Sequence, residues 1–456
     1  MINQNKFISK IEANKFLNSQ GDEFTIINNP DYIHPSFEIV PLALKLSPPL
    51  KGLRAVVMDM DGTITTTEKL CIHSLEFMIR KMSGKLEKDS WIGIDEKIDF
   101  PNIIGNSTTK HVEYLLTRYT KLLSSDDILK SFIYAALWTL YIGKDENRKA
   151  EVKLNLANFG LSNIHKNERL LRLTDSNSVT ETELHSITDS LLGGLEMTLN
   201  LSSINEYVRI GIDIYYQRYH EILKRIEDGK GNDISRELFG NSENHLIEPM
   251  PGVVIFLSLV KGWLGEEIIN IIPQLIKEYE LKSNQIFAGN IDEVTNKLLT
   301  LSKYFQINPI KTAIVTSSIS YEAKIVMAEM VKVARNEIPK YNLSSETENF
   351  LHNKFSNYKN LFDAFVTASD SSEIRLKPHR DLYSIALHQL GISKNIFDQV
   401  IGFEDSESGT IAIRAAGIGM CIAVPFAETS GHNLDAATFI CEGGLPEALL
   451  NYNLFL

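Results

Sequence analysis

The stretch that most constrains the fold of this chain is residues 54–68, RAVVMDMDGTITTTE. Its apolar run, Ala55–Met58, predicts a buried strand, and Asp59 and Asp61 come directly at the end of that strand. Gly62 comes next, where a tight turn needs a residue with a permissive backbone. Ligands in open α/β sheets bind just beyond the carboxyl ends of the strands. The two carboxylates are therefore candidates for a metal site and a nucleophile.

The Asp-x-Asp-Gly pattern has two simpler explanations. Asp and Gly are ordinary turn residues, so the segment could be a plain turn. The other explanation is a calcium-binding loop, which needs Gly at its sixth position and Glu at its twelfth. Counted from Asp59, Gly62 is fourth and Leu70 is twelfth, and this excludes the calcium loop. The choice between a turn and a catalytic site depends on whether partner residues occur later in the chain.

Three later segments carry residues that would complete a catalytic site. KTAIVTSS predicts a second strand that ends in hydroxyls, beginning with Thr316. EIRLKPHRDLY places Lys377 just before a Pro that suits the first turn of a helix. QVIGFEDSESG predicts a third strand, which ends in Glu404 and Asp405. Each segment alone has an ordinary explanation, a surface lysine or a solvated strand end, but all of them in this order are very unlikely to arise by accident.

With these four motifs in order, the chain resembles the haloacid dehalogenase superfamily, and within it the branch of β-phosphoglucomutase and small-molecule phosphatases. The matching motifs are DMDGT, Thr316 at a strand end, Lys377 in KPxxDLY, and the acidic pair in GFEDSESG. PMPGV at 249–253 and IAIRAAGIGMCIAVP at 411–425 extend the match. The resemblance covers about residues 53–70 and 249–445. It implies an α/β fold, a doubly wound parallel (Rossmann-like) sheet with a large inserted all-helical cap.

The pattern of apolar residues along the sequence divides the chain into the same parts. Apolar residues at three-to-four spacing predict helices through most of 71–248, an unusually large cap. Strands in AIVTSS, FVTASD, QVIGFED, GMCIAVP and TFICEG alternate with helices, as in a parallel sheet. The Pro-rich start predicts an extended arm laid on the core. The expected parts are the arm 1–50, the core 51–70 and 249–456, and the cap 71–248. The core is expected to carry two insertions, at about 264–307 and 337–358. These insertions would lie either on the periphery of the sheet or at an oligomer interface.

The resemblance implies roles for the acidic residues. Asp59 is expected to be the nucleophile and a Mg²⁺ ligand. Asp61 is expected to offer its backbone carbonyl to Mg²⁺ and its side chain as general acid and base. Asp405 is expected to bind Mg²⁺ directly, with Glu404 alongside or through water; an oxygen-only site suits Mg²⁺ better than zinc. The acidic residue at Asp61 favours phosphoryl transfer, since dehalogenases of the family carry an aromatic residue there and phosphonatases an Ala.

Thr316 and Lys377 are expected to hold the phosphoryl group, helped by backbone N–H groups near Gly62 and Ser317. No Walker-type loop and no complete Gly-x-Gly-x-x-Gly is present in the sequence, so phosphate binding must use groups other than these glycine-rich loops. The chain departs from the family at Thr66, where an Asp is frequent, and at Arg380, where a second Pro is frequent. Arg380 lies in the loop that would aim Lys377.

One cap segment, FPNIIGNSTTKHVEYLL, looks like the family's substrate-specificity loop. There Asn106, Ser107 and Thr108 would hydrogen-bond a polar substrate at a helix N-terminus, and Lys110 or His111 would pair with an anionic one. The alternative is a plain capped helix start, because Asn, Ser and Thr are common capping residues.

Composition limits the kind of partner. A net charge of −12 argues against a general nucleic-acid or anionic-membrane binder, which would need a basic face. Cys71, Cys421 and Cys441 share no metal-ligand spacing and are expected to be reduced. The N-terminus lacks the apolar core of a signal peptide, so a cytoplasmic protein is expected. The protein is expected to be a monomer or a small homo-oligomer.

The leading hypothesis is a Mg²⁺-dependent phosphohydrolase that acts on a small phosphorylated metabolite, a sugar phosphate being one candidate, through an aspartyl-phosphate. The alternative enzyme is a phosphomutase of the β-phosphoglucomutase type, which the sequence does not distinguish. A non-catalytic partner-binding module with a vestigial site is a third hypothesis. The intact cluster of like charges weighs against it, because such a cluster is costly to keep without a function.

Overall fold

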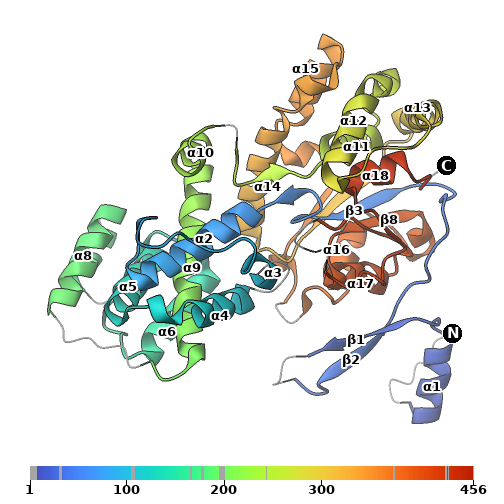
Figure 1. Ribbon diagram of the computed structural model, residues 1–456. Coiled ribbons are helices and arrows are strands. Elements are labelled where there is room, and N and C mark those ends of the chain that lie inside the picture. Colours follow the sequence, from blue (N-terminus) through green and yellow to red (C-terminus); the bar gives the residue numbers. More distant parts are fainter. Residues whose placement is uncertain are drawn as a thin grey trace. The chain divides into compact units, whose positions relative to one another are not determined.

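The computed structural model contains two compact units, Met1–Thr66 with Ile247–Leu456, and Thr67–Leu246 (Figure 1). The structure describes residues 8–29, 33–103, 108–164, 167–175, 179–194, 201–242, 244–372, 375–426, 429 and 431–454. The second unit is inserted into the first between two short strands, β4 (Thr65–Thr66) and β5 (Glu248–Pro249), which pair antiparallel. This pairing closes the first unit across the insertion point.

Six parallel strands form the central sheet of the first unit in the order β10-β9-β8-β3-β6-β7. Their bounds are β3 Ala55–Asp59, β6 Lys311–Val315, β7 Ala364–Val366, β8 Val400–Glu404, β9 Met420–Ala423 and β10 Phe439–Ile440. Every residue of β3 is buried, as expected for a strand covered on both faces of a parallel sheet. β3 lies between β6 and β8, so the ends of these three strands meet at one edge.

Helices cover both faces of this sheet. On one face, α16 (Asp381–Gln389) and α17 (Glu407–Ala415) pack Leu382 and Ile413 against Val57 of β3 and its neighbours. On the other face, α11 (Val253–Val260) places Phe256 edge-on to Phe403 of β8, with ring centroids 5.1 Å apart. Figure 1 shows α16 and α17 on one side of the strands and α11 and α18 on the other. The predicted doubly wound α/β class is confirmed.

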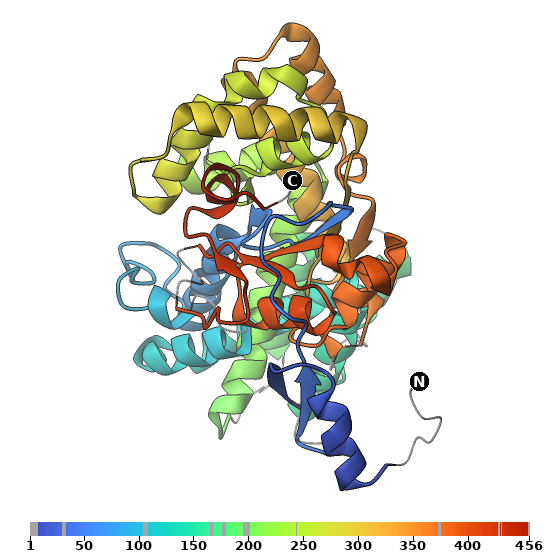
Figure 2. The same cartoon turned by 90° about the vertical axis from the view of Figure 1, so that its right-hand side faces the viewer.

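The first unit contains further helices. They are α12 (Ile268–Ser283), α13 (Ile291–Ile307), α14 (Ser320–Ala334), α15 (Ser345–Lys354) and α18 (Gly444–Leu450). The stretch 264–307 contains α12 and α13, which contact α18 and α11 respectively. In Figure 2 the yellow helix α12 lies beside the dark red α18. The stretch 337–358 contains α15, and its Ser344 N–H donates to Glu267 at 2.6 Å. The two insertions are therefore joined to each other.

The N-terminal segment differs from the extended arm that its prolines predict. It contains a helix, α1 (Lys10–Asn18), and an antiparallel pair of strands, β1 (Phe24–Asn28) and β2 (Phe37–Pro41). Pro35 lies between the two strands and Pro41 is the last residue of β2, where a missing N–H donor costs little. The chain then lies along the core: the N–H of Ala43 donates to Arg414 O, and the buried Arg414 guanidinium donates back to Ala43 O at 2.7 Å.

The second unit is helical throughout its described part. Its helices are α2 Glu68–Ser83, α3 Phe100–Ile103, α4 Thr108–Arg118, α5 Ser125–Tyr141, α6 Glu146–Asn158, α7 Glu168–Asp175, α8 Glu181–Gly194, α9 Ile204–Glu227 and α10 Gly231–Phe239. The longest helix, α9, contacts α2, α4 and α5. Gly211 of α9 allows the close approach of α4, because a Cβ there would lie 2.7 Å from the Val112 side chain. In the described part of the chain, no helix has both the length and the apolar character to cross a membrane.

Candidate active site

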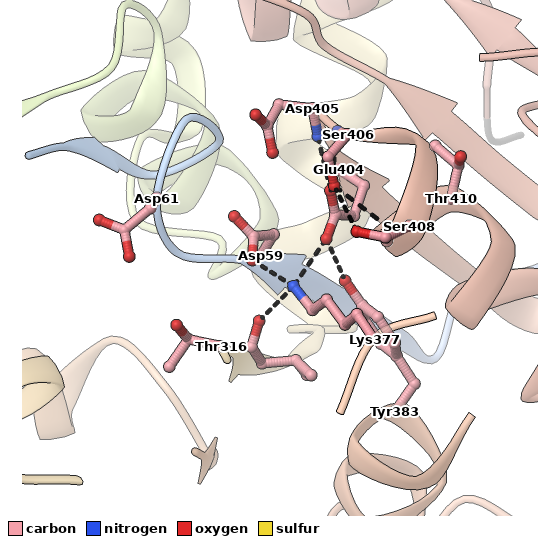
Figure 3. A network of polar contacts seen from close by, with 12 residues as sticks. Asp59, Asp61, Thr316, Lys377, Tyr383, Glu404, Asp405, Ser406, Ser408 and Thr410 are labelled. Atoms are coloured by element: carbon pink, nitrogen blue, oxygen red, sulfur yellow. Dashed lines mark hydrogen bonds and ion pairs between the residues drawn. The ribbon is translucent and has the colours of Figure 1, made fainter. Parts of the chain in front are cut away.

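The carboxyl ends of β3, β6 and β8 place four of the predicted residues together (Figure 3). Asp59 is the last residue of β3 and Glu404 the last of β8, while Thr316 directly follows β6. Asp59 is paired in register with Val315, so Thr316 lies one residue beyond the level of the nucleophile candidate at the same edge of the sheet. Lys377 comes from the loop before α16 and reaches the same edge.

The ammonium of Lys377 is the centre of this arrangement. It forms ion pairs with the carboxylates of Asp59 and Glu404, the latter at 2.6 Å, and donates to the backbone oxygen of Val315 at 3.1 Å. Its side chain is only 6% exposed. The ring of Tyr383 lies beneath it, 5.3 Å from the nitrogen to the centroid. An ammonium has three donors, so the three oxygens fix the direction of Lys377.

Glu404 is held from several sides. One of its oxygens accepts from Lys377 and from the Tyr383 hydroxyl, the latter at 3.3 Å. The other accepts from the N–H of Asp405 and from the N–H and hydroxyl of Ser406 at 2.8–2.9 Å. Both oxygens are therefore occupied by donors. The Gly409 backbone makes room for this carboxylate, because a Cβ at Gly409 would lie 1.7 Å from a Glu404 oxygen.

Asp405 faces the turn that comes after β3. Gly62 in that turn has a φ of 88°, and a Cβ there would lie 2.5 Å from the Asp405 carboxylate and 2.6 Å from the Phe426 ring. Glycine is required at this position both for its positive φ and for the close approach of Asp405. The motifs DMDGT and GFEDSESG are therefore adjacent in space.

Asp61 and Thr316 are positioned differently from the central pair. The Asp61 carboxylate points away from Lys377 in Figure 3 and accepts from the Ser318 hydroxyl at 3.3 Å. Asp61 is partly exposed, whereas Thr316 is buried and its hydroxyl accepts from the Ser318 N–H at 3.0 Å. Ser317 is exposed. The Asp61 side chain can therefore contact solvent at this edge of the sheet, whereas the buried Asp59 side chain cannot.

Carboxylates outnumber cations at this edge. Oxygens of Asp59, Glu404 and Asp405 lie within 4.8 Å of one another, and all three residues are buried. Burial raises the pKa of Asp59 well above its usual range, although Lys377 opposes the rise. Burial, followed by the charges of Glu404 and Asp59, also raises the pKa of Asp405 well above its usual range. Burial would likewise raise the pKa of Glu404, but Lys377 and Ser406 hold it below its usual value.

This charge balance suits a divalent cation. Three carboxylates around one ammonium leave an excess of negative charge in a buried place, where an unpaired charge is costly. The ligand atoms offered by Asp59, Glu404 and Asp405 are all oxygens, the kind that Mg²⁺ prefers. The donor set therefore fits the metal that the sequence motifs imply.

Several residues that complete this network had no role in the sequence-based prediction. Tyr383 is the last residue of KPxxDLY and entered that prediction only as part of the motif. Ser406 caps α17 by accepting from the Gly409 N–H, and its position in a Ser-x-x-Gly stretch before a helix is a recognisable signal. Ser318 comes one residue after the predicted Ser317.

The predicted cap contacts lie in the other unit. Asn106 and Ser107 fall outside the described residues. Thr108 and Lys110 lie in the first turn of α4, with Thr108 partly exposed and Lys110 exposed, and His111 is buried in the same helix. The substrate role of this segment stays a prediction.

The strand order places the Asp59 strand at the centre of a parallel sheet, with Thr316 and the acidic pair at the ends of its two neighbours. A helical unit is inserted just after the first of these strands, and the lysine arrives from the loop before α16. This is the arrangement that the resemblance to the haloacid dehalogenase superfamily implies.

Comparisons with solved structures find similar chains at low identity and low TM-score. CbbY from Rhodobacter sphaeroides, in complex with phosphate, is 12% identical, with 88% of this chain and 100% of that chain covered and a TM-score of 0.34. A hydrolase from Pseudomonas syringae is 12% identical (86% and 95% covered, TM-score 0.32). The β-phosphoglucomutase of Clostridium difficile is 15% identical (85% and 90% covered, TM-score 0.26). No family model matches the sequence, and no curated protein is significantly similar to it. With TM-scores this low, the activity has to be argued from the site itself.

Proposed function

We propose that this protein is a Mg²⁺-dependent phosphohydrolase that acts on a small phosphorylated metabolite through an aspartyl-phosphate. One observation carries the proposal: a strand-end Asp59 is held by a buried Lys377 within a cluster of oxygen ligands. A carboxylate that only stabilised the fold would gain nothing from two further carboxylates beside it. A carboxylate that attacks phosphorus needs both a cation to hold it and a metal site next to it.

Asp59 acts as the nucleophile in this proposal. Phosphate monoesters are among the slowest bonds to hydrolyse, and a covalent intermediate divides the reaction into two easier steps. One Asp59 oxygen attacks phosphorus while the ester oxygen leaves, and water later releases phosphate from the carboxylate. Lys377 keeps Asp59 in place and meets the negative oxygens of the phosphoryl group, together with the Thr316 hydroxyl and the N–H groups near Gly62 and Ser317.

Asp59 and Asp405 would hold Mg²⁺, with the backbone carbonyl of Asp61, and Glu404 would lie alongside. When bound, Mg²⁺ reduces the repulsion between the carboxylate and the phosphate and stabilises the charge on the phosphoryl oxygens. Both Glu404 oxygens already accept hydrogen bonds from protein donors. The main task of Glu404 in this proposal is therefore to position Lys377.

Asp61 acts as general acid toward the leaving oxygen and then as general base toward water. It comes two residues after Asp59, and its side chain is partly exposed and accepts from the Ser318 hydroxyl. A group in this position can reach a leaving group that lies outside the buried pocket, which Asp59 cannot.

The substrate is proposed to be small because the helical unit is inserted after β4, the point of the chain at which a cap is expected. A phosphomutase would use the same residues and differ in protecting the aspartyl-phosphate from water. Burst kinetics and stimulation by a bisphosphate distinguish the two activities, since only a mutase requires a bisphosphate for turnover.

The test is a panel of phosphorylated metabolites assayed for phosphate release with Mg²⁺ and with EDTA, using the wild type and Asp59→Asn. Release by the wild type with Mg²⁺, abolished by EDTA and by Asp59→Asn, supports the proposal. Release that persists in Asp59→Asn would remove Asp59 from the nucleophile's role. Asp61→Asn serves as a second variant: it should lower turnover far more than binding of a phosphate analogue such as vanadate, and equal losses would contradict its acid–base role.

A further inference from the structure

The helical unit contains a cavity that the catalytic proposal does not use. It offers about 150 Å³ to molecules the size of water and is lined by residues of α2, α5, α8 and α9. All of its lining residues belong to the helical unit, so the cavity is separate from the Asp59 site. For scale, an apolar cavity of about 150 Å³ inside a helical protein holds one benzene. The space therefore suits one ring-sized molecule.

Three polar groups on its wall have no hydrogen-bond or ion-pair partner among the described residues. They are the Lys81 ammonium of α2, the Tyr134 hydroxyl of α5 and the His185 ring nitrogens of α8. Lys81 rests against the Phe77 ring, with its nitrogen 5.2 Å from the centroid. Tyr134 is buried, Lys81 is partly buried and His185 is exposed. The Tyr134 hydroxyl and the Lys81 ammonium are therefore the two groups at the cavity that are available to a ligand with complementary acceptors.

The wall also has an aromatic surface. The rings of Tyr134 and His185 are stacked, with centroids 4.0 Å apart and an angle of 12° between their planes. Ile214 of α9 and Leu86 add apolar surface to the lining. Flat aromatic walls favour planar ligands, because a ring can extend the stack.

Lys81 is the lysine of the lining that has no ion-pair partner among the described residues, because Lys130 pairs with Asp189. Burial lowers the pKa of Lys81, and burial lowers the pKa of His185, as happens to cations that lack a counter-ion. The nearby acidic side chains have other partners: Glu221 pairs with Arg218, and Asp189 pairs with Lys130 at the rim. The Asp127 carboxylate also lines the cavity, beside Gly84, and has no ion-pair partner among the described residues. Lys81 is thus the cation that remains for a ligand.

We propose that this cavity binds one small planar organic carboxylate, with the ring against the Tyr134–His185 stack and the carboxylate held by Lys81 and the Tyr134 hydroxyl. The site is independent of the phosphoryl-transfer proposal. It would give the helical unit a second ligand, distinct in chemistry from a phosphate ester.

The test uses benzoate as the probe and benzamide, its neutral isostere, as the control, with calorimetric titration of the full chain in the presence of EDTA. Benzoate is expected to bind and benzamide to bind at least about tenfold more weakly, because a charge-assisted hydrogen bond is lost. Lys81→Met should weaken benzoate binding by about tenfold or more, and Tyr134→Phe by about two- to tenfold. Lys153→Met, which changes an exposed lysine of α6 outside the cavity, should leave binding unchanged.

The catalytic site is the main competing location for the probe. Lys377→Met should therefore retain benzoate binding, and loss in Lys377→Met with retention in Lys81→Met would overturn the proposal. Equal affinity for benzoate and benzamide, or no binding of benzoate up to millimolar concentrations, would also overturn it. Lys81→Met removes an unpaired half-buried charge, so thermal unfolding of the unliganded variant should match the wild type and confirm that it is folded.

Discussion

The Lys377 ammonium donates to Glu404 at 2.6 Å, and Glu404 in turn is fixed by the backbone at the start of α17. Lys377 also pairs with Asp59 at the end of the central strand. Three motifs that lie far apart in the sequence are thus joined through one nitrogen. The position of the nucleophile candidate depends on this lysine.

Lys377→Met should reduce kcat by about 10²–10³-fold, because the phosphoryl oxygens lose a buried cation. It should also lower the free energy of unfolding by about 3–5 kcal/mol, since Asp59 and Glu404 are left as buried, unpaired carboxylates. Urea unfolding and steady-state kinetics measure the two effects. Tyr383→Phe is the matched comparison: it removes only the 3.3 Å hydrogen bond to Glu404 and should cost about 1 kcal/mol and little activity. Comparable losses in both variants would show that Lys377 has no special role.

Gly409→Ala should impair the site without touching any charged residue. The added methyl would lie 1.7 Å from a Glu404 oxygen, so Glu404 must move and release Lys377. We expect turnover to fall by at least about tenfold and the free energy of unfolding to fall by about 1–3 kcal/mol, the range typical of overpacking. Gly193→Ala in α8 meets no atom within 4 Å and is the control, with stability equal to or slightly above wild type. Full activity of Gly409→Ala would mean that Glu404 does not hold the lysine.

Asp405→Asn should separate metal binding from folding. In EDTA the wild type keeps three buried carboxylates around one ammonium, so replacing one by a neutral amide should leave the thermal unfolding temperature equal or higher. With Mg²⁺ the wild type should gain stability, and the variant should need about tenfold more Mg²⁺ or more for the same gain. Thermal unfolding across a Mg²⁺ series measures this. Identical Mg²⁺ responses would place the metal elsewhere.

Glu337, which is not one of the proposed active-site residues, should make the free energy of unfolding depend on pH. Burial, then the neighbouring Glu278, raises the pKa of Glu337 from 4.5 to about 7. The folded state therefore holds a proton between these values that the unfolded state releases. The stabilisation is complete below about pH 4.5 and is lost as the pH rises through about 7, by on the order of 3 kcal/mol.

Urea unfolding at pH 5 and pH 8 tests this. Glu337→Gln should show a smaller fall in the free energy of unfolding than the wild type and should be the more stable of the two at pH 8. Glu346→Gln, an exposed position in α15, should behave as the wild type. A Glu337→Gln variant with the full wild-type pH dependence would contradict the assignment.

The strands of the central sheet could be predicted from strong local signals. The apolar runs of β3, β6 and β8 are short, uninterrupted and end in polar residues, and such runs are typical of strands buried in a parallel sheet. Because parallel strands end at a common edge, Asp59, Thr316 and Glu404 could be expected to meet. The side-chain pattern alone does not reveal that Glu404 accepts from both Lys377 and Tyr383, since that depends on how α16 packs under the sheet.

Other features depend on contacts that no single segment carries. Five prolines in residues 1–50 predicted an extended arm, but a strand tolerates Pro at its end, and Pro41 stands there in β2. The arm gains its order from Arg414, which is far away in sequence. The cavity beside Lys81 is likewise made by four helices at once, so the spacing within each helix predicts only its buried face.

During turnover, phosphorus is expected to become bonded to Asp59. The most direct measurement is acid quenching of the enzyme during turnover of a phosphorylated substrate with Mg²⁺, followed by peptide mass spectrometry. Phosphate is expected on the peptide that contains Asp59, and none on that peptide in Asp59→Asn. Phosphate on a different residue, or turnover with no phosphorylated peptide at any quench time, would contradict it.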